Sequence, residues 1–447
     1  MNDMNKVFGI LSVLFLAFVA SGCDSESEKY NGMRVGNPQF EEYAGVYRLY
    51  PAADLRRGDS PKGYRPVYIS HYGRHGSRYL IYDSQYVQVA DVLRKAYEDG
   101  KLTAFGKDVH DRYMSIYPQL KGRADELTQI GMKQPRVIAK RMYHSYPEIF
   151  GADPVIEAYT TMTGRTMLTM AGFCESLKEE DPELNIFQEA TILNIRKLNP
   201  YHAAAKAIPD DERASFKGPK ATWLEGYKAY MAEVIDPSAF MARLFTDVGY
   251  ASALCTPSEF MRNLRYVAIH LQGTDQCSTS FADVFTEEEL AVLWECDNIT
   301  YYMEKGHGFN SSRCPIYSYH MLEALIEDAE KALASGSPTV HLRFGHDGCM
   351  IALFALMDVE GWNAHAETFA EIKDVFGNWR TPMGANFQMV FYKGKSEDDV
   401  LMRFYLNEEP YPLPLEDVGD LFYRWSDFKE VYKEKVRWAA AYLAPQS

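Results

Sequence analysis

The pattern of apolar and polar positions predicts strands towards both ends of the chain. β-branched and aromatic residues fill residues 66–71 and 154–160, and comparable short runs return at 339–344, 386–392 and 400–405. Runs of this length and composition are typical of buried strands. A polar turn separates the last two runs, so we expect them to pair as a hairpin.

Helical spacing of apolar positions follows most of the predicted strands. The helices expected beside them are 85–97, 127–146, 165–178, 349–357 and 428–443. The middle of the chain has a different character, because helix-like stretches predominate there and few strands interrupt them. Those stretches are 221–234, 257–271, 287–294 and 317–334.

This order of elements predicts an α/β fold: a mixed sheet flanked by helices on both faces, with an inserted, mainly α-helical cap. We expect the α/β core to comprise residues 41–180 and 336–447, and the cap to comprise residues 181–335. Open α/β sheets bind ligands where the carboxyl ends of their strands lead into helices. Candidate chemistry is therefore expected in the loops that follow the predicted strands.

The first residues of the chain, 1–23, resemble a bacterial lipoprotein signal peptide. Lys6 precedes an apolar run, and small residues lead into Cys23, the expected lipidation site. Residues 24–40 follow as a tether. The pattern predicts an exported lipoprotein whose lipid anchor holds it to a membrane, in the periplasm or at the cell surface. An ordinary secretory signal is the alternative.

Charge and cysteine content narrow the classes of partner. The chain has 62 Asp and Glu against 47 Lys and Arg, a formal net charge of -15. This balance argues against nucleic acid as a partner, because phosphate backbones need a basic footprint. The cysteines other than Cys23 permit either disulfides or free buried thiols in an exported protein, and none forms a cluster with metal-ligand spacing. We expect no metal and no cofactor.

The first candidate site is the segment Arg74-His75-Gly76-Ser77-Arg78, directly after a predicted strand. Two arginines four positions apart suit a tetrahedral dianion, because a guanidinium pairs bidentately with phosphate oxygens. Gly76 is expected to let the backbone approach a ligand, and a helix beginning near Ser77 would add free N–H groups. His75 can present a neutral nitrogen that attacks phosphorus. A surface loop with two solvated arginines is the alternative.

The second candidate site is Gly345-His346-Asp347, which follows the predicted strand at 339–344. Asp347 can protonate a departing alkoxide and then accept a proton from water. A carboxyl that faces phosphate is expected to have a raised pKa, because like charge disfavours its ionised form. His346 would add a charged hydrogen bond to the phosphate. For Asp347, the alternative is a simple role as helix N-cap.

A third segment, Thr160-Thr161-Met162-Thr163-Gly164-Arg165-Thr166, again lies between a strand and a helix. The three segments, with Leu127-Thr128-Gln129-Ile130-Gly131 and Gln134 as a structural addition, resemble the histidine phosphatase superfamily in its acid phosphatase and phytase branch. The resemblance implies that His75 is a nucleophile that forms a phosphohistidine and that Asp347 is the proton donor. The residues that it implies to bind phosphate are Arg74, Arg78, Arg165 and His346.

The expected activity is therefore hydrolysis of small-molecule phosphomonoesters, with phytate and other inositol polyphosphates as candidate substrates. The chain departs from the branch at Leu80, where proline is usual. Its first motif also resembles the inositol polyphosphate phosphatases, which commonly carry His-Ala-Glu where this chain has His346-Asp347-Gly348. That departure puts phytate specificity in doubt.

Three other functions are alternatives to a phosphatase. A non-catalytic, ligand-binding surface lipoprotein would use the 31 tyrosines of the chain for binding. A metallohydrolase would use His71 and His75 as ligands, but four-residue spacing does not converge at a strand end. A mutase would share the Arg-His-Gly element, whereas the length, the export signal and the His-Asp pair favour a hydrolase.

Overall fold

The computed structural model describes residues 36–40, 42–51, 60–151, 153–202, 205–275, 278–310 and 313–444. The predicted signal peptide, Cys23 and residues 24–35 of the predicted tether lie outside the described residues. Within the described ranges, none of the helices combines the length and apolar character that a membrane crossing requires.

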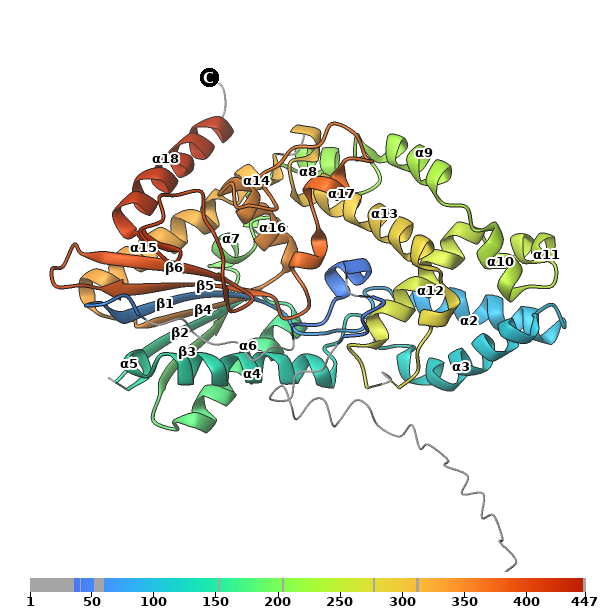
Figure 1. The fold of residues 1–447 in the computed structure, drawn as a ribbon, viewed down its shortest axis with the longest axis horizontal. Helices are drawn as coiled ribbons and strands as arrows, with labels where there is room; N and C mark the ends of the chain where they lie inside the picture. The colour runs from blue at the N-terminus through green and yellow to red at the C-terminus, as the bar shows by residue number, and fades with distance from the viewer. Residues whose placement is uncertain are drawn as a thin grey trace, which may run out of the picture.

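A mixed sheet of eight strands forms the centre of one half of the molecule (Figure 1). Its order is β3-β2-β4-β1-β5-β6-β7, and β8 pairs with β6. Neighbours among β3, β2, β4 and β1 run parallel, whereas the pairs formed by β5 to β8 are antiparallel. The strands are β1 Arg65–Arg74, β2 Val155–Thr160, β3 Asn185–Ala190, β4 Val340–Gly345, β5 Asn386–Lys393, β6 Val400–Leu406, β7 Glu409–Pro410 and β8 Phe422–Arg424.

Helices cover both faces of this sheet (Figure 1). On one face, α4 and α6 pack against each other and bury Ile69, Ile156 and Leu342 of the strands. On the other, α15, α16 and α18 enclose a larger core, in which the rings of Phe354 and Phe387 lie 5.5 Å apart. This arrangement confirms the predicted α/β fold. The helices are α4 Gln129–Ser145, α5 Pro147–Phe150, α6 Gly164–Glu180, α15 Tyr319–Ser335, α16 Asp347–Leu356 and α18 Trp425–Leu443.

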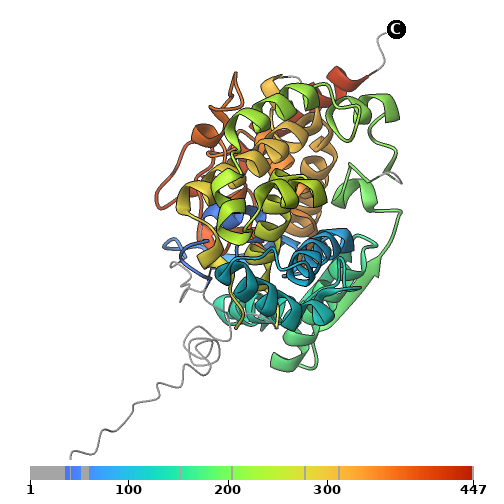
Figure 2. The ribbon, with the colours of Figure 1, turned by 90° about the vertical axis from the view of Figure 1, so that its right-hand side faces the viewer.

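A mainly helical part lies beside the sheet, and Figure 2 views the molecule from that side. Two of its helices come from an early segment of the chain: α2 packs against α12, and α3 packs against α10. Its helices are α2 Asp83–Glu98, α3 Ala104–Leu120, α9 Leu224–Val234, α10 Ser238–Leu244, α11 Val248–Leu254, α12 Pro257–Leu271 and α13 Glu287–Lys305. The shorter helices elsewhere are η1 Glu42–Tyr47, α7 Ile195–Leu198, α8 Asp210–Phe216, η3 Ala282–Val284, η4 Gly308–Asn310, α14 Cys314–Tyr317, α17 Ile372–Val375 and η5 Asn378–Arg380.

The sheet and the helical part divide the chain differently from the predicted boundaries. Strand β3 lies inside the interval 181–335, yet it pairs with β2 along its whole length. It is an edge strand with only partly buried side chains, so its sequence carries little of the apolar signal of the inner strands. The sheet therefore reaches residue 190, and the helices of the cap come from two separate segments.

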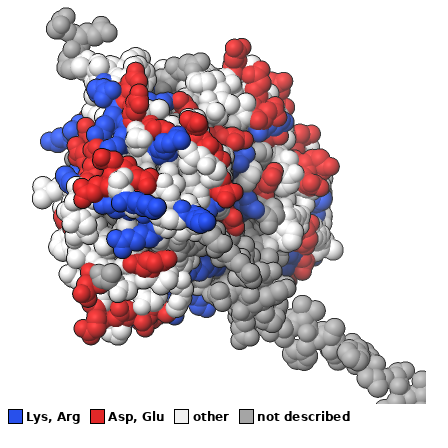
Figure 3. Space-filling view, turned by 60° about the vertical axis from the view of Figure 1, so that its left-hand side comes forward, with Lys and Arg blue, Asp and Glu red and all other residues white. Residues whose placement is uncertain are grey.

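Neither a single charged region on the face seen in Figure 3 nor a disulfide among the described cysteines contributes to this fold. Lys and Arg are interspersed with Asp and Glu on the face seen in Figure 3, so the net charge of -15 does not gather there in one acidic region. Cys277 lies outside the described residues. The cysteines that the structure describes are all free thiols, namely Cys174, Cys255, Cys296, Cys314 and Cys349.

Candidate active site

Three parallel strands bring the predicted site residues to one edge of the sheet. Arg74, the last residue of β1, pairs with Gly345 at the end of β4. Thr160, the last residue of β2, pairs with Phe344 of β4. The loops that follow, which carry the other predicted site residues, therefore leave the sheet side by side.

His75 is buried, and its own loop sets the orientation of its ring. Its Nδ1 lies 2.9 Å from the carbonyl oxygen of Gly76. Because a carbonyl can only accept, Nδ1 donates the proton and Nε2 of the neutral ring keeps a free lone pair. Burial, and then the charges of Arg74 and Arg165, hold the pKa of His75 well below its ordinary value of 6.5. The ring therefore stays neutral in weak acid.

Arg74 is buried at the centre of the site and is held on three sides. Its Nη1 donates to the backbone carbonyls of Val46 at 2.7 Å and Thr381 at 2.8 Å. Its Nη2 lies 3.0 Å from Oδ2 of Asp347, which joins the first and second predicted segments directly. Because charge-assisted contacts fix this guanidinium, its position is set before any ligand binds.

Arg78 and Arg165 meet at Asp125, a residue that the sequence analysis did not single out. Arg165 donates from Nη1 to Asp125, and Nε of Arg78 lies 3.9 Å from Oδ1 of the same carboxylate. With the pair formed by Arg74 and Asp347, three guanidinium groups stand against two carboxylates, so the site has a net positive charge. Among the described residues, the buried Nε group of each arginine has no hydrogen-bond acceptor.

Asp347 is the first residue of α16. Its Oδ1 accepts the N–H of Gly348 at 2.8 Å. Burial would raise the pKa of this carboxyl, but Arg74 and the Gly348 N–H outweigh burial and hold it below its ordinary value of 3.8. The raised pKa predicted for a carboxyl that faces phosphate is therefore not a property of the free site, where Asp347 pairs directly with Arg74. The N-cap of α16 is His346, so a simple N-cap role for Asp347 is also wrong.

His346 faces His75, and their ring centroids lie 5.7 Å apart. Its Nε2 lies 3.3 Å from Oγ1 of Thr161, in the loop that follows β2. Burial, and then the nearby charge of Arg165, lower the pKa of His346 to about 3. His346 is therefore uncharged in the free site, whereas the sequence predicted a charged hydrogen bond to a bound phosphate.

The loop that carries His75 does not lead into a helix near Ser77, because α2 begins only at Asp83. Its backbone donors are already satisfied: the N–H of Gly76 donates to Oγ1 of Thr169 at 3.2 Å, and that of Ser77 donates to Oε1 of Gln134 at 2.8 Å. The predicted anion site at a helix N-terminus is therefore wrong.

Gly76 has a packing role that differs from the predicted one. A Cβ at position 76 would overlap the carbonyl group of Gly131 in α4, and a Cβ at 131 would overlap the carbonyl oxygen of Ser77. The two glycines let the loop and the helix pack backbone to backbone. The absence of a side chain at Gly76 therefore makes room for the backbone of α4, whereas the sequence suggested that it makes room for a ligand.

His71 packs away from any metal-like arrangement. Its ring lies 5.2 Å from that of Phe173 and 5.4 Å from that of Phe344, and burial lowers its pKa to about 3. In the described ranges, no group of three or more His, Cys, Asp or Glu side chains could hold a metal ion.

Sequence reasoning missed several residues that shape the site. The hydroxyl of Tyr47 accepts a hydrogen bond from Nη1 of Arg78 at 3.3 Å, and burial followed by Asp347 raises the pKa of Tyr301 well above its ordinary value. Tyr47 lies in a stretch without helical or strand periodicity. Tyr301 lies beyond the end of the helix predicted at 287–294, and Asp125 lies between the helices predicted at 85–97 and 127–146. Only the high tyrosine content of the chain gave a signal, and it pointed to no position.

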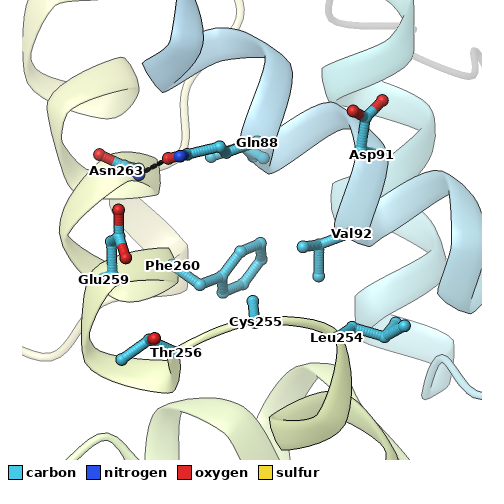
Figure 4. A pocket seen from close by; sticks show the side chains of 10 residues that line it. Gln88, Asp91, Val92, Leu254, Cys255, Thr256, Glu259, Phe260 and Asn263 are labelled. Atoms are coloured by element: carbon cyan, nitrogen blue, oxygen red, sulfur yellow. Dashed lines mark hydrogen bonds between the residues drawn. The ribbon is translucent and has the colours of Figure 1, made fainter.

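Two cavities lie near these elements. One, of about 160 Å³, is lined in part by Arg78, Tyr47 and Tyr301, and so opens on the candidate site. The other, of about 250 Å³, lies between α2 and α12, where Gln88 and Asn263 form a hydrogen bond of 2.7 Å (Figure 4). Its walls include none of the predicted site residues.

Solved structures of known proteins share this fold. Multiple inositol polyphosphate phosphatase from Bifidobacterium longum, in complex with inositol hexasulfate, has a TM-score of 0.72 at 16% identity, over 88% of this chain and 97% of that one. The phytase from D. castellii has a TM-score of 0.66 at 15% identity, over 89% and 85%. The Hafnia alvei phytase has a TM-score of 0.54 at 13% identity, over 85% and 99%.

A search of curated protein sequences found no match. A family model, the histidine phosphatase superfamily (branch 2), matches residues 73–407, which include every predicted site residue except Cys23. The match covers well over half of the chain and confirms the resemblance inferred from the sequence. The chain therefore belongs to branch 2 of the histidine phosphatase superfamily.

Proposed function

We propose that this phosphoric monoester hydrolase works through a phosphohistidine formed on His75. The observation that carries the proposal is the orientation of the His75 ring, whose Nδ1 is bonded to the Gly76 carbonyl while Nε2 remains unprotonated. A free imidazole lone pair beside three guanidinium groups is suited to attack phosphorus in a bound phosphate. A non-catalytic binding protein has no need of this arrangement.

The arginines supply most of the proposed catalysis. Arg74, Arg78 and Arg165 would bind the phosphate oxygens, with a neutral hydrogen bond from His346. Phosphoryl transfer leaves the protein mainly the tasks of positioning the substrate and stabilising charge. A phosphate dianion would also compete with Asp125 for two of the arginines, so the ion pairs of the free site hold those side chains ready.

The proposed reaction has two displacements. In the first, Nε2 of His75 forms a bond to phosphorus as the bond to the leaving oxygen breaks, and the protonated carboxyl of Asp347 gives its proton to that oxygen. In the second, water attacks phosphorus, the N–P bond breaks, and the Asp347 carboxylate accepts the proton of the water. A phosphate dianion on Arg74 would weaken the Arg74–Asp347 pair and raise the pKa of the carboxyl, which prepares the first step.

A quench experiment tests the nucleophile. Brief incubation with a phosphate ester labelled in its phosphoryl group should give acid-labile, base-stable label on the wild-type protein and none on His75→Ala. The variant should lose turnover by at least about a thousandfold, because a nucleophile acts as one unit with its acid and its oxyanion donors. Equal thermal midpoints would show that folding is intact. Label on the variant, or turnover near the wild-type rate, would refute the role of His75.

Small-molecule phosphate esters are the proposed substrates. Relatives in fold include an inositol polyphosphate phosphatase and phytases, so inositol phosphates belong in the first assay panel. The net positive charge of the site supports a dianionic phosphate on any of these esters.

Export as a lipoprotein is a separate proposal, supported by the apolar run before Cys23. Incorporation of labelled palmitate in a bacterial host should depend on Cys23 and be lost in Cys23→Ser, whereas Cys255→Ser should keep the label. Label that persists in Cys23→Ser would refute the anchor and leave the phosphatase proposal untouched.

A further inference from the structure

The cavity at the site continues away from the phosphate-binding residues. Arg78 and Tyr301 belong to both regions: they lie beside Arg74 and Asp347, and they also line the cavity of about 160 Å³. A phosphate bound by the arginines would therefore direct the rest of the ester into this cavity. Its walls decide which leaving group the enzyme accepts.

Four tyrosines contribute to those walls. Tyr47, Tyr82, Tyr266 and Tyr301 all line the cavity, and they come from four separate places in the chain: η1, the residue before α2, α12 and α13. The guanidinium of Arg78 lies over the ring of Tyr47 at 5.2 Å. Aromatic faces pack well against rings, and a tyrosine can do so with little loss of conformational freedom.

Charged groups are scarce in the same cavity. Arg78 is the only cation among the described residues that line it. The only carboxylate, Asp297, is already engaged by Nη1 of Arg265 and by the hydroxyl of Tyr266, each at 2.5 Å. Lys305, one helical turn beyond Tyr301, lies over the ring of Tyr201 at 4.6 Å and is not part of the wall. Among the described lining residues, further phosphates on a leaving group would find no cation besides Arg78.

Two large apolar side chains at the cavity, Ile81 and Tyr82, remain exposed to solvent although the fold does not need them there. Ile81 is 43% exposed and Tyr82 is 65% exposed, and both line the cavity just before α2. Among the described residues, no side chain forms a hydrogen bond with the Tyr82 hydroxyl. Neighbouring apolar side chains that stay exposed beside a binding site often contact a ligand.

The geometry points to a substrate whose leaving group is an uncharged ring, which packs on Tyr82 and Ile81 while the single phosphate binds the arginines. This inference rests on the proposed phosphatase function and narrows it to phosphomonoesters of aryl or sugar type. It places inositol hexakisphosphate, with five further phosphates around its ring, among the poor substrates. Charge complementarity decides this, because a further phosphate that enters the cavity would lose hydration without gaining a second cation from the described lining residues.

The test compares kcat/KM for phenyl phosphate, glucose phosphate, glycerol phosphate and inositol hexakisphosphate in the wild type and in Tyr82→Ala. Tyr82 is largely exposed, so its removal should leave the thermal midpoint unchanged. Tyr442→Ala is the matched control, because Tyr442 is 52% exposed on α18 and lies outside the cavity wall. Comparing the ratio between two substrates in a variant with the same ratio in the wild type cancels differences in leaving-group reactivity.

We expect Tyr82→Ala to lower kcat/KM for a ring substrate about tenfold relative to acyclic glycerol phosphate, the loss of one aromatic contact. Tyr442→Ala should leave that ratio unchanged. A larger loss for phenyl than for glucose phosphate would identify an aryl ester, and the reverse a sugar ester. An unchanged ratio in Tyr82→Ala, or a wild-type preference for inositol hexakisphosphate, would overturn the inference. Release of phosphate from none of the four would instead refute the phosphatase function.

Discussion

At the scale of single residues, one guanidinium controls both reacting groups. Arg74 lies beside His75 and pairs with Asp347, and its positive charge lowers the pKa of both. For an imidazole a lowered pKa means a neutral ring, whereas for a carboxyl it means an ionised group. In the proposed mechanism, the free site therefore has a neutral nucleophile, His75, and an unprotonated acid, Asp347. Binding of substrate phosphate must supply the change at Asp347.

The role of Asp347 as proton donor can be tested with esters whose leaving groups differ in their need for a proton. We predict that Asp347→Asn lowers kcat for an alkyl phosphate by about a hundredfold or more, because the alkoxide then departs without a proton. An activated aryl phosphate should lose far less, because its leaving group needs little protonation. Steady-state rates on such a pair of esters measure the difference. Equal losses on both would assign Asp347 a purely structural role.

The acid side of the pH profile should report His75. Because its pKa lies well below 6.5, protonation inactivates it only at correspondingly low pH, so kcat/KM for an activated aryl ester should hold as pH falls through 6.5. For an alkyl ester, kcat should fall on the alkaline side, where Asp347 in the complex loses its proton. A profile that drops on acidification with a midpoint at or above 6.5 would contradict a buried, neutral His75.

At the scale of elements, helix α4 acts as a template for the loop that carries His75. Gln134 accepts the N–H of Ser77, and the backbone N–H of Thr128, the N-cap of α4, donates to the Ser77 carbonyl at 2.9 Å. Gly131 lets the two backbones touch. The loop is thus fixed by an element that contributes no catalytic side chain.

A substitution at Gly131 tests the close contact between α4 and the loop, and a second glycine-to-alanine change controls for the higher helix propensity of alanine. Gly131→Ala would force the loop away, because the new Cβ meets the backbone of Ser77. We expect it to lower the free energy of unfolding by about 1–3 kcal/mol, as overpacking does, and to reduce turnover as the ring of His75 shifts. Gly172→Ala in α6 is the matched control, because its Cβ would find its nearest neighbours at 3.6 Å or beyond.

Gly172→Ala should leave the free energy of unfolding unchanged or raise it slightly, because alanine favours a helix more than glycine does. Denaturant midpoints and kcat measure the two effects. If Gly131→Ala behaved like Gly172→Ala in both, close packing between α4 and the loop would not matter to the site.

At the scale of the whole molecule, burial of neutral histidines links stability to pH. Burial lowers the pKa to about 3 in His71, His341 and His346, and to about 4 in His270. In the unfolded chain each would titrate near 6.5. A lowered folded pKa means that the unfolded state binds the proton first, so the stability is present above pH 6.5 and is lost as pH falls towards the folded pKa.

We therefore predict that the free energy of unfolding falls steeply below about pH 6, by up to about 1.4 kcal/mol per pH unit for each such histidine. Urea midpoints between pH 7 and 4.5 measure the slope. His71→Leu should reduce the slope by about one proton, because His71 packs between Phe173 and Phe344 without a hydrogen bond to its Nδ1 in the described structure. An identical slope in this variant would contradict the argument.

Local patterns in the sequence were sufficient for most elements and for the positions of the three loops. The strand at 66–71 and the helix at 257–271 have periodicity that depends only on neighbours in the chain, and both appear as β1 and α12. His75, Arg165 and Asp347 could be located because each follows such a strand. Weak local signals account for the failures, as in the edge strand β3.

Only the tertiary structure decided which charges meet and which groups carry protons. Arg74 and Asp347 are far apart in the chain, and Asp125 gained its role only when folding placed it between Arg78 and Arg165. The protonation states of His75 and Asp347 depend on burial and on distances between charges, and local periodicity in the sequence predicts neither. For the same reason the tyrosine-lined cavity beside Arg78, assembled from separate segments, could be recognised only after folding.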